Sequence, residues 1–116
     1  MKNRDKVCLE KIVGYCEEII DFSQGVTWEE FSENSLLKYA ISFALGQIGE
    51  LVKIISADSK DNYVKIPWRK IAGMRNKIVH EYGNFDQVIM WEIVTINIPE
   101  LLENVSAILE SGADGQ

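Results

Sequence analysis

The run LLKYAISFALGQIGELVKII, within residues 35–56, constrains the fold more than any other part of the chain. As a helix it is apolar around most of its circumference, so it must be central in its own bundle or buried against a second subunit. Gly46 and Gly49 each cost about 1 kcal/mol relative to alanine in a helix interior, and their small size permits close approach by another helix. Glu50, which follows them, is either a solvated residue or a residue that holds the side chains of a functional site in position.

Two further helix signals lie in the N-terminal part. Apolar residues recur at three- and four-residue spacing through residues 3–22, which predicts an amphipathic helix that Ser23-Gln24-Gly25 ends. Thr27 and Glu30 then have the spacing of a capping box, so a short helix or the lead-in to a long one is expected there.

The C-terminal half predicts two more helices after a polar loop at residues 57–66. The third helix is expected over residues 67–82, with Pro67 in its first turn and Gly83 at its left-handed C′ position. The fourth is expected from a cap at Asp86 to about residue 109. Pro99 is expected to break or kink it, or residues 97–100 to cap a new helix.

The fold class is therefore all-α, an antiparallel bundle of four main helices with a possible short fifth. At 116 residues the chain is expected to be one domain, residues 1–110, with a frayed tail at 111–116. No apolar run reaches the length of a membrane span, and no signal peptide is evident, so no membrane association and a soluble, cytoplasmic protein are expected. Cys8 and Cys16 are eight residues apart on one helix, too far for a disulfide, and are expected to be buried apolar residues.

The residues that carry chemistry gather in residues 67–86, PWRKIAGMRNKIVHEYGNFD. This segment holds the single histidine, His80, together with Arg75, Asn76 and Tyr82. On a continuous helix Asn76 and His80 share one face, and Arg75 and Tyr82 share an adjacent stripe. All four side chains are therefore expected to face one cleft, with His80 in the last helical turn.

The local charge of the same region is opposite in sign to the net charge of the chain. Five basic residues and no acidic one lie between Asn62 and His80, giving a local charge of +5 in a chain of net charge −6. The acidic total alone argues against nucleic-acid binding, but a basic patch confined to a cleft attracts a polyanion. Arg69, Lys70 and Lys77 are the residues of this patch that are predicted to bind the polyanion.

The motif at residues 75–82, of the form R-x4-H-x-Y, resembles that of the HepT-like branch of the HEPN superfamily, small helical toxins paired with nucleotidyltransferase antitoxins. The resemblance extends over nearly the whole chain through Ile48-Gly49-Glu50, Trp68, Met74, Asp86, and the run 88–101 with Trp91 and Pro99. It implies an endoribonuclease in which Arg75, Asn76 and His80 are catalytic. The polyanion that Arg69, Lys70 and Lys77 bind is then expected to be RNA. The resemblance also implies that a cognate nucleotidyltransferase silences the toxin by transferring AMP to Tyr82.

Metal-free RNA cleavage needs a base for the 2′-OH, an acid for the leaving oxygen and a cation at the phosphorane. One chain supplies one histidine, so a homodimer that pairs two third helices is expected, as the resemblance implies. No carboxylate cluster for Mg²⁺ accompanies the motif, and neither a metal nor a cofactor is predicted.

Two other interpretations stay open at this point. The chain is alternatively a non-catalytic helical module that dimerises and docks a nucleotidyltransferase, with Arg75 and His80 holding a nucleotide or pairing structurally. A third interpretation is an interaction protein whose apolar second helix is an oligomer interface.

Overall fold

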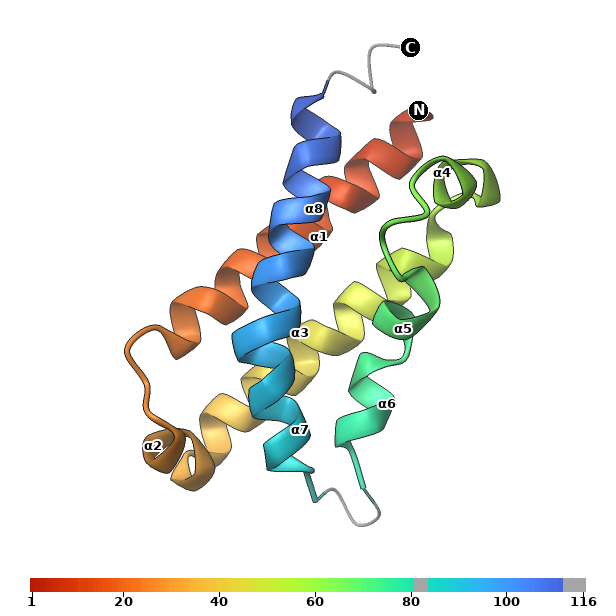
Figure 1. The fold of residues 1–116 in the computed structure, drawn as a ribbon. Helices are drawn as coiled ribbons and strands as arrows, with labels where there is room; N and C mark the ends of the chain where they lie inside the picture. Colours follow the sequence, from red (N-terminus) through yellow and green to blue (C-terminus); the bar gives the residue numbers. More distant parts are fainter. Residues whose placement is uncertain (81–83, 112–116) are drawn as a thin grey trace.

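Four helical stretches run alternately up and down and form an antiparallel bundle (Figure 1). The computed structural model describes residues 1–80 and 84–111. The elements, in chain order, are α1 (Asn3–Ser23), α2 (Trp28–Glu33), α3 (Ser35–Ile54), α4 (Ala57–Asn62), α5 (Trp68–Ala72), α6 (Met74–Ile78), α7 (Gln87–Glu92), the π-helical turn η2 (Ile93–Asn97) and α8 (Ile98–Glu110). The four stretches are α1, α3, α5 with α6, and α7 through α8. The predicted all-α bundle of four main helices is confirmed, and two short helices, α2 and α4, accompany it in the described residues.

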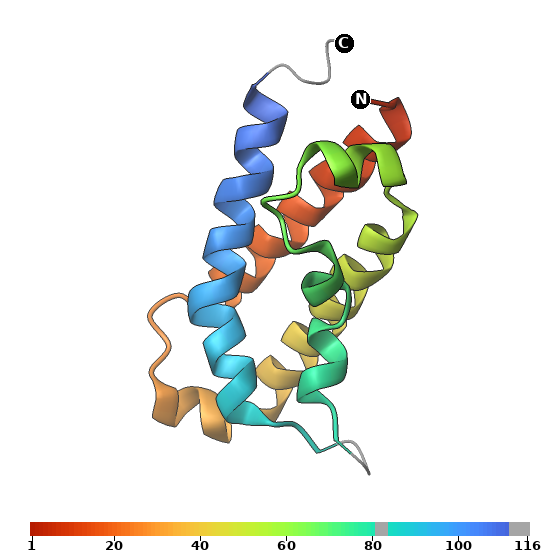
Figure 2. The same cartoon turned by 45° about the vertical axis from the view of Figure 1, so that its right-hand side comes forward.

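The long helix α3 lies at the centre, as the apolar run predicted. It packs against α1 on one side and against α5 and α6 on the other, and α1 also packs against α8. Figure 2 shows α5 and α6 following one another along α3. The largest fully buried side chains come from every long element: Phe31, Leu9, Ile12, Ile19, Ile41, Leu45, Ile48, Ile78, Met90, Ile98, Val52 and Val105.

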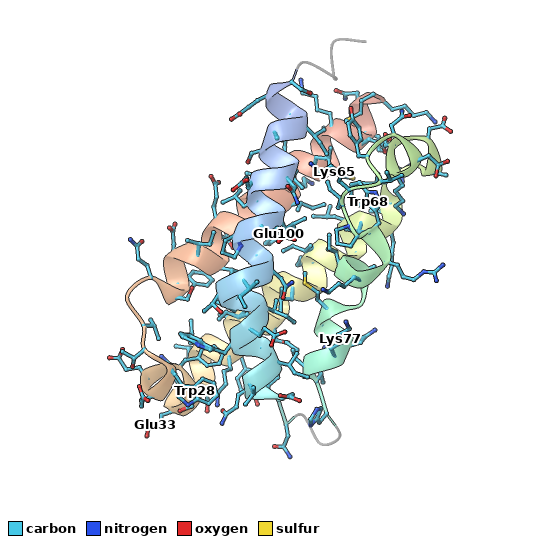
Figure 3. All side chains as sticks on the ribbon, in the orientation of Figure 1. Trp28, Glu33, Lys65, Trp68, Lys77 and Glu100 are labelled. Atoms are coloured by element: carbon cyan, nitrogen blue, oxygen red, sulfur yellow. The ribbon has the colours of Figure 1, made fainter. Side chains whose placement is uncertain are left out.

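The predicted capping box at Thr27 is confirmed and fixes the short helix α2. The Glu30 amide donates to the Thr27 hydroxyl at 3.1 Å, and the Thr27 amide donates to the Glu30 carboxylate at 2.9 Å. Trp28 (Figure 3), Phe31 and Trp91 then form an aromatic cluster with ring centroids 4.9–6.2 Å apart. This cluster packs α2 against α7.

The third helix differs from its prediction, because it is broken at Gly73 and ends at Ile78 rather than near residue 82. Val79 has an extended backbone and pairs with Phe85 as an isolated antiparallel bridge. The Asp86 amide donates to the Ile78 carbonyl at 2.7 Å, and the His80 amide donates to the Asn84 carbonyl at 2.6 Å. These bonds, together with the β-branched Val79, replace the helical turn that the sequence pattern predicted.

The fourth stretch is one continuous helical path with a π turn, and Asp86 caps its start as predicted. Pro99 has no amide hydrogen, and its ring crowds the carbonyl four residues earlier, at Thr95. The widened turn η2 surrounds Thr95 and accommodates this ring. As the alternative predicted, a new α-helix, α8, starts after Asn97 with Pro99 in its first turn, but Asn97 has helical torsions and makes no side-chain cap bond, so the path stays continuous.

Residues 57–66, predicted as a polar loop, contain the helix α4, because Ser56 caps it and a buried carboxylate holds its start. Asp5, in α1, is buried and accepts hydrogen bonds from the Ser56 amide at 3.0 Å and from the Ser56 and Ser59 hydroxyls at 2.6 Å each. Burial raises the pKa of Asp5, but these hydrogen bonds outweigh it and leave the pKa below its usual value. The cluster joins α1 to the junction of α3 and α4.

The two cysteines are free and buried, as predicted. Burial, followed by the charge of Glu17, raises the pKa of the Cys16 thiol to about 12. Cys16 is therefore an unreactive core residue at neutral pH.

Three expectations lie outside the described residues: the modification site at Tyr82, the helix cap at Gly83 and the tail beyond residue 111. Within residues 1–80 and 84–111, no helix has both the length and the apolar content needed to cross a bilayer.

We predict that Asp5→Asn lowers the free energy of unfolding at pH 7 by about 1–3 kcal/mol, because charged hydrogen bonds are replaced by weaker ones. The pKa of Asp5 is lowered in the folded state. Its contribution to the free energy of unfolding is therefore full above the usual carboxyl pKa of 3.8 and is lost as the pH falls through the folded pKa. The difference between wild type and variant should therefore shrink on acidification. Urea unfolding at several pH values checks this, with Asp21→Asn, an exposed position of the same helix, as the control. Equal stability of Asp5→Asn and wild type at pH 7 would contradict it.

Candidate functional site

Arg75 and Asn76 lie together in an open cavity of about 410 Å³ on one face of the bundle. Its walls come from α3 on one side and from α5 and α6 on the other. The lining residues are Tyr39, Ser42, Phe43, Gly46, Gln47, Gly49, Glu50, Lys53, Ala72, Arg75 and Asn76. Two of the three predicted catalytic residues therefore share one cavity.

The two glycines of α3 allow the short helices to reach this position. A Cβ at Gly49 would lie 2.9 Å from the carbonyl oxygen of Ala72, and a Cβ at Gly46 would lie 2.9 Å from Cδ of Arg75. Both distances are shorter than the non-bonded contacts that a Cβ atom makes in folded proteins. The expected close approach of another helix is therefore confirmed at Gly49, whereas the group that approaches Gly46 is the side chain of Arg75.

Arg75 is exposed, and within the described residues its guanidinium makes no hydrogen bond or ion pair. At the rim of the cavity Glu50 pairs instead with Lys53, at 3.0 Å. The guanidinium can thus present its forked N–H groups to an anion such as a phosphate.

His80 lies beyond the end of α6 and not in a helical turn, so the helical-face argument for its position is wrong. Its imidazole is about half exposed, and Nε2 lies 3.8 Å from Oδ2 of Asp86. The other oxygen of Asp86 accepts the Ile89 amide at 3.0 Å and caps α7. A distance of 3.8 Å is too long for a hydrogen bond but allows a charge interaction once the ring is protonated.

His80 is not among the residues that line the Arg75 cavity. The two regions are joined through Tyr39, which lines that cavity and packs edge-on against Phe85 with ring centroids 5.2 Å apart. Tyr39 and Phe85 also line a second, polar hollow of about 350 Å³. The bridge at Val79 and Phe85 thus places His80 beside the Arg75 cavity but outside its walls.

The three predicted RNA-binding residues are exposed but do not line the cavity. Lys70 lies on the side of α5 that faces α8, beside Asn97, Glu100 and Asn104. Lys77 projects from α6 (Figure 3).

Sequence reasoning missed the contribution of α3 to this cavity, which includes Tyr39, Ser42, Phe43, Gln47 and Lys53. These positions recur at three- and four-residue intervals around Gly46 and Gly49. The helical face that contains both glycines was the sequence feature from which these lining residues could have been predicted.

An exposed apolar stripe on α3 borders the cavity. Leu36 is 80% exposed, Tyr39 61% and Phe43 65%, and their spacing places them on one helix face. Tyr39 and Phe43 also line the cavity. Neighbouring large apolar side chains with this exposure are typical of a protein interaction surface.

The site thus combines a guanidinium free to bind an anion, an amide, and a histidine beside a carboxylate. These groups can bind a phosphodiester and transfer protons near neutral pH. The chain is thus a small helical protein with a candidate phosphodiester-binding site.

Comparisons with known proteins agree with this class. The model of a family described as Ribonuclease HepT-like matches residues 12–108. Two proteins of Methanocaldococcus jannaschii that carry RNase names are each 38% identical over 111 residues, which is 95% of this chain and 96% and 92% of theirs. A protein of Thermococcus cleftensis that carries the name ribonuclease HepT is 37% identical over 101 residues, 87% of this chain and 92% of its own. No solved structure matches the chain.

The chain therefore belongs to the HepT-like ribonuclease family. Its all-α bundle and the sequence motif at residues 75–82 agree with this membership.

Proposed function

We propose that this chain is the toxin of a toxin-antitoxin pair, a metal-independent endoribonuclease that acts as a homodimer. Arg75, Asn76 and His80 are its catalytic residues, and both subunits contribute to the reaction centre. The observation that carries this proposal is the exposed Arg75 in a cavity that has no histidine of the same chain in its described lining and is bordered by an apolar stripe. Family membership and the RNase names of relatives support a ribonuclease.

The proposed reaction is a transesterification within the RNA chain. A neutral imidazole takes the proton of the 2′-OH as the 2′-oxygen attacks phosphorus, and the bond from phosphorus to the 5′-oxygen breaks as a protonated imidazole supplies its proton. The products are a 2′,3′-cyclic phosphate and a free 5′-OH. Arg75 stabilises the charge that develops on the phosphorane, and Asn76 orients the phosphate.

The reaction needs one proton acceptor and one proton donor, but each chain has one histidine. A two-fold dimer through the apolar stripe of α3 supplies both, because the stripe borders the Arg75 cavity and lies next to the loop that carries His80. Once it is protonated, the imidazole that acts as the acid can make a charge interaction with the Asp86 carboxylate, whose Oδ2 lies 3.8 Å from Nε2. Covering Leu36, Tyr39 and Phe43 also removes exposed apolar surface from water.

Purified protein should cleave RNA in the presence of EDTA and leave a 2′,3′-cyclic phosphate. His80→Ala should lower kcat/KM by about 10²–10⁴-fold, the usual contribution of a positioned acid or base, while folding normally because the side chain is half exposed. Arg75→Lys should also be severely impaired, because an ammonium cannot fork onto phosphate as guanidinium does.

A fluorescent RNA substrate measures the rates and mass spectrometry identifies the product. Arg4→Lys, an exposed position at the start of α1, is the matched control and should cleave like wild type. Retained cleavage by His80→Ala, or complete inhibition by EDTA, would exclude the mechanism.

Leu36→Glu should convert the dimer to a monomer and abolish cleavage, because it places a charge on the most exposed residue of the proposed interface stripe, which does not line the cavity. Val64→Glu adds the same charge at another exposed apolar position, outside α3, and should remain dimeric and active. Light scattering at micromolar concentration measures the assembly. A Leu36→Glu monomer that still cleaves RNA would remove the argument for a shared site.

We further propose that a cognate nucleotidyltransferase silences the toxin by transferring one or more AMP groups to Tyr82. A phosphodiester anion near the site would obstruct RNA and cancel part of the local positive charge. Tyr82 lies outside the described residues, and the family motif at residues 75–82 supports this assignment.

Incubation with the nucleotidyltransferase, ATP and Mg²⁺ should add the mass of one or more AMP groups and abolish cleavage. Tyr82→Phe should cleave RNA but escape both modification and protection by co-expressed antitoxin, whereas Tyr63→Phe, as the control, should be modified like wild type. If the antitoxin neutralises Tyr82→Phe as well as wild type, silencing works by binding alone.

A further inference from the structure

The side chain of Arg75 lies directly on the backbone of α3 at Gly46. A Cβ built at Gly46 would be 2.9 Å from Cδ of Arg75 and 3.5 Å from its Nε. The aliphatic part of the arginine therefore occupies the space that any side chain at residue 46 would need.

The backbone gives no other reason for glycine at this position. Gly46 is in the interior of α3, where glycine destabilises a helix relative to alanine. Among the described glycines, only Gly25 has the positive φ that other residues avoid. The contact with Arg75 is thus the observed feature that distinguishes glycine from alanine here.

The other glycines of long helices make different contacts. A Cβ at Gly49 would meet the backbone carbonyl of Ala72, which is part of α5 and has little freedom to move. A Cβ at Gly14, in α1, would meet nothing within 4 Å. Gly49 therefore serves helix packing, whereas the contact of Gly46 is with a flexible side chain.

No hydrogen bond or ion pair within the described residues holds the guanidinium of Arg75. Contacts of its aliphatic part with the cavity wall must therefore set its direction. A methyl group at residue 46 would displace this part of the side chain, because an exposed arginine yields more easily than the backbone of a central helix.

We infer that Gly46 is a positioning residue for Arg75, and that the absence of a side chain at residue 46 sets where the guanidinium meets the scissile phosphate. This inference rests on the proposed ribonuclease function. It assigns Gly46 no contact with RNA, only an effect exerted through Arg75.

The test compares Gly46→Ala with Gly14→Ala, since each replaces an interior helix glycine by alanine. Gly14→Ala should raise Tm and leave cleavage unchanged. Gly46→Ala should stay folded but lose about tenfold to hundredfold in kcat, the effect of displacing a catalytic group by about 1 Å, with a smaller change in KM. In an Arg75→Ala background, Gly46→Ala should cause no further loss of activity. A loss equal to that in the wild-type background would overturn the inference.

A second measurement does not depend on activity. The chain has three arginines, Arg4, Arg69 and Arg75, so their Nε–Hε signals can be assigned by NMR. Gly46→Ala should shift the Arg75 signal and leave the other two unchanged. If wild type does not cleave RNA, the proposed function fails while this shift still tests the contact. If wild type cleaves RNA and Gly46→Ala keeps both full kcat and an unshifted Arg75 signal, the positioning role is wrong.

Discussion

The close approach of α5 and α6 to α3 is the constraint on which the candidate site depends. Gly49 makes it possible, because its missing side chain leaves room for the backbone carbonyl of Ala72, and Gly46 leaves room for the side chain of Arg75 in the same way. The helix tolerates the cost of these glycines because it contributes more buried residues than any other described helix and packs against α1, α5 and α6. Without this approach the Arg75 cavity would lose one of its two walls.

The second determinant is the end of α6. The chain leaves the helix at Val79, pairs with Phe85 and returns to the cap at Asp86. His80 and Asp86 thereby come from the two sides of a short connection and meet at 3.8 Å. The histidine is placed by backbone pairing at Asn84, next to Phe85, whose ring packs against Tyr39 of the apolar stripe of α3.

Much of this arrangement could be predicted from sequence. The apolar run of α3, the stripe of α1, the caps at Thr27 and Asp86 and the close approach at Gly46 and Gly49 all follow from local patterns with known physical causes. The break of the third helix could not be predicted in the same way, because the bridge between Val79 and Phe85 is a tertiary contact that outweighs helical periodicity.

The helical pattern correctly predicted that Arg75 and Asn76 share one cavity. It assigned His80 to a helical turn, which is wrong because the bridge between Val79 and Phe85 ends the helix before that residue. It also gave no indication that Tyr39, Phe43 and Lys53 would line the cavity, because their part in it depends on which face of α3 meets α6.

The central claim is that two subunits share one reaction centre, and mixed dimers test it most directly. Wild-type and His80→Ala chains, co-refolded in known ratios so that subunits exchange fully, form a statistical mixture of dimers. If each active centre needs the histidines of both subunits, activity follows the square of the wild-type fraction, and an equal mixture retains about a quarter of the activity. A linear fall, with about half of the activity left in the equal mixture, would show that each chain works alone and would contradict the shared site.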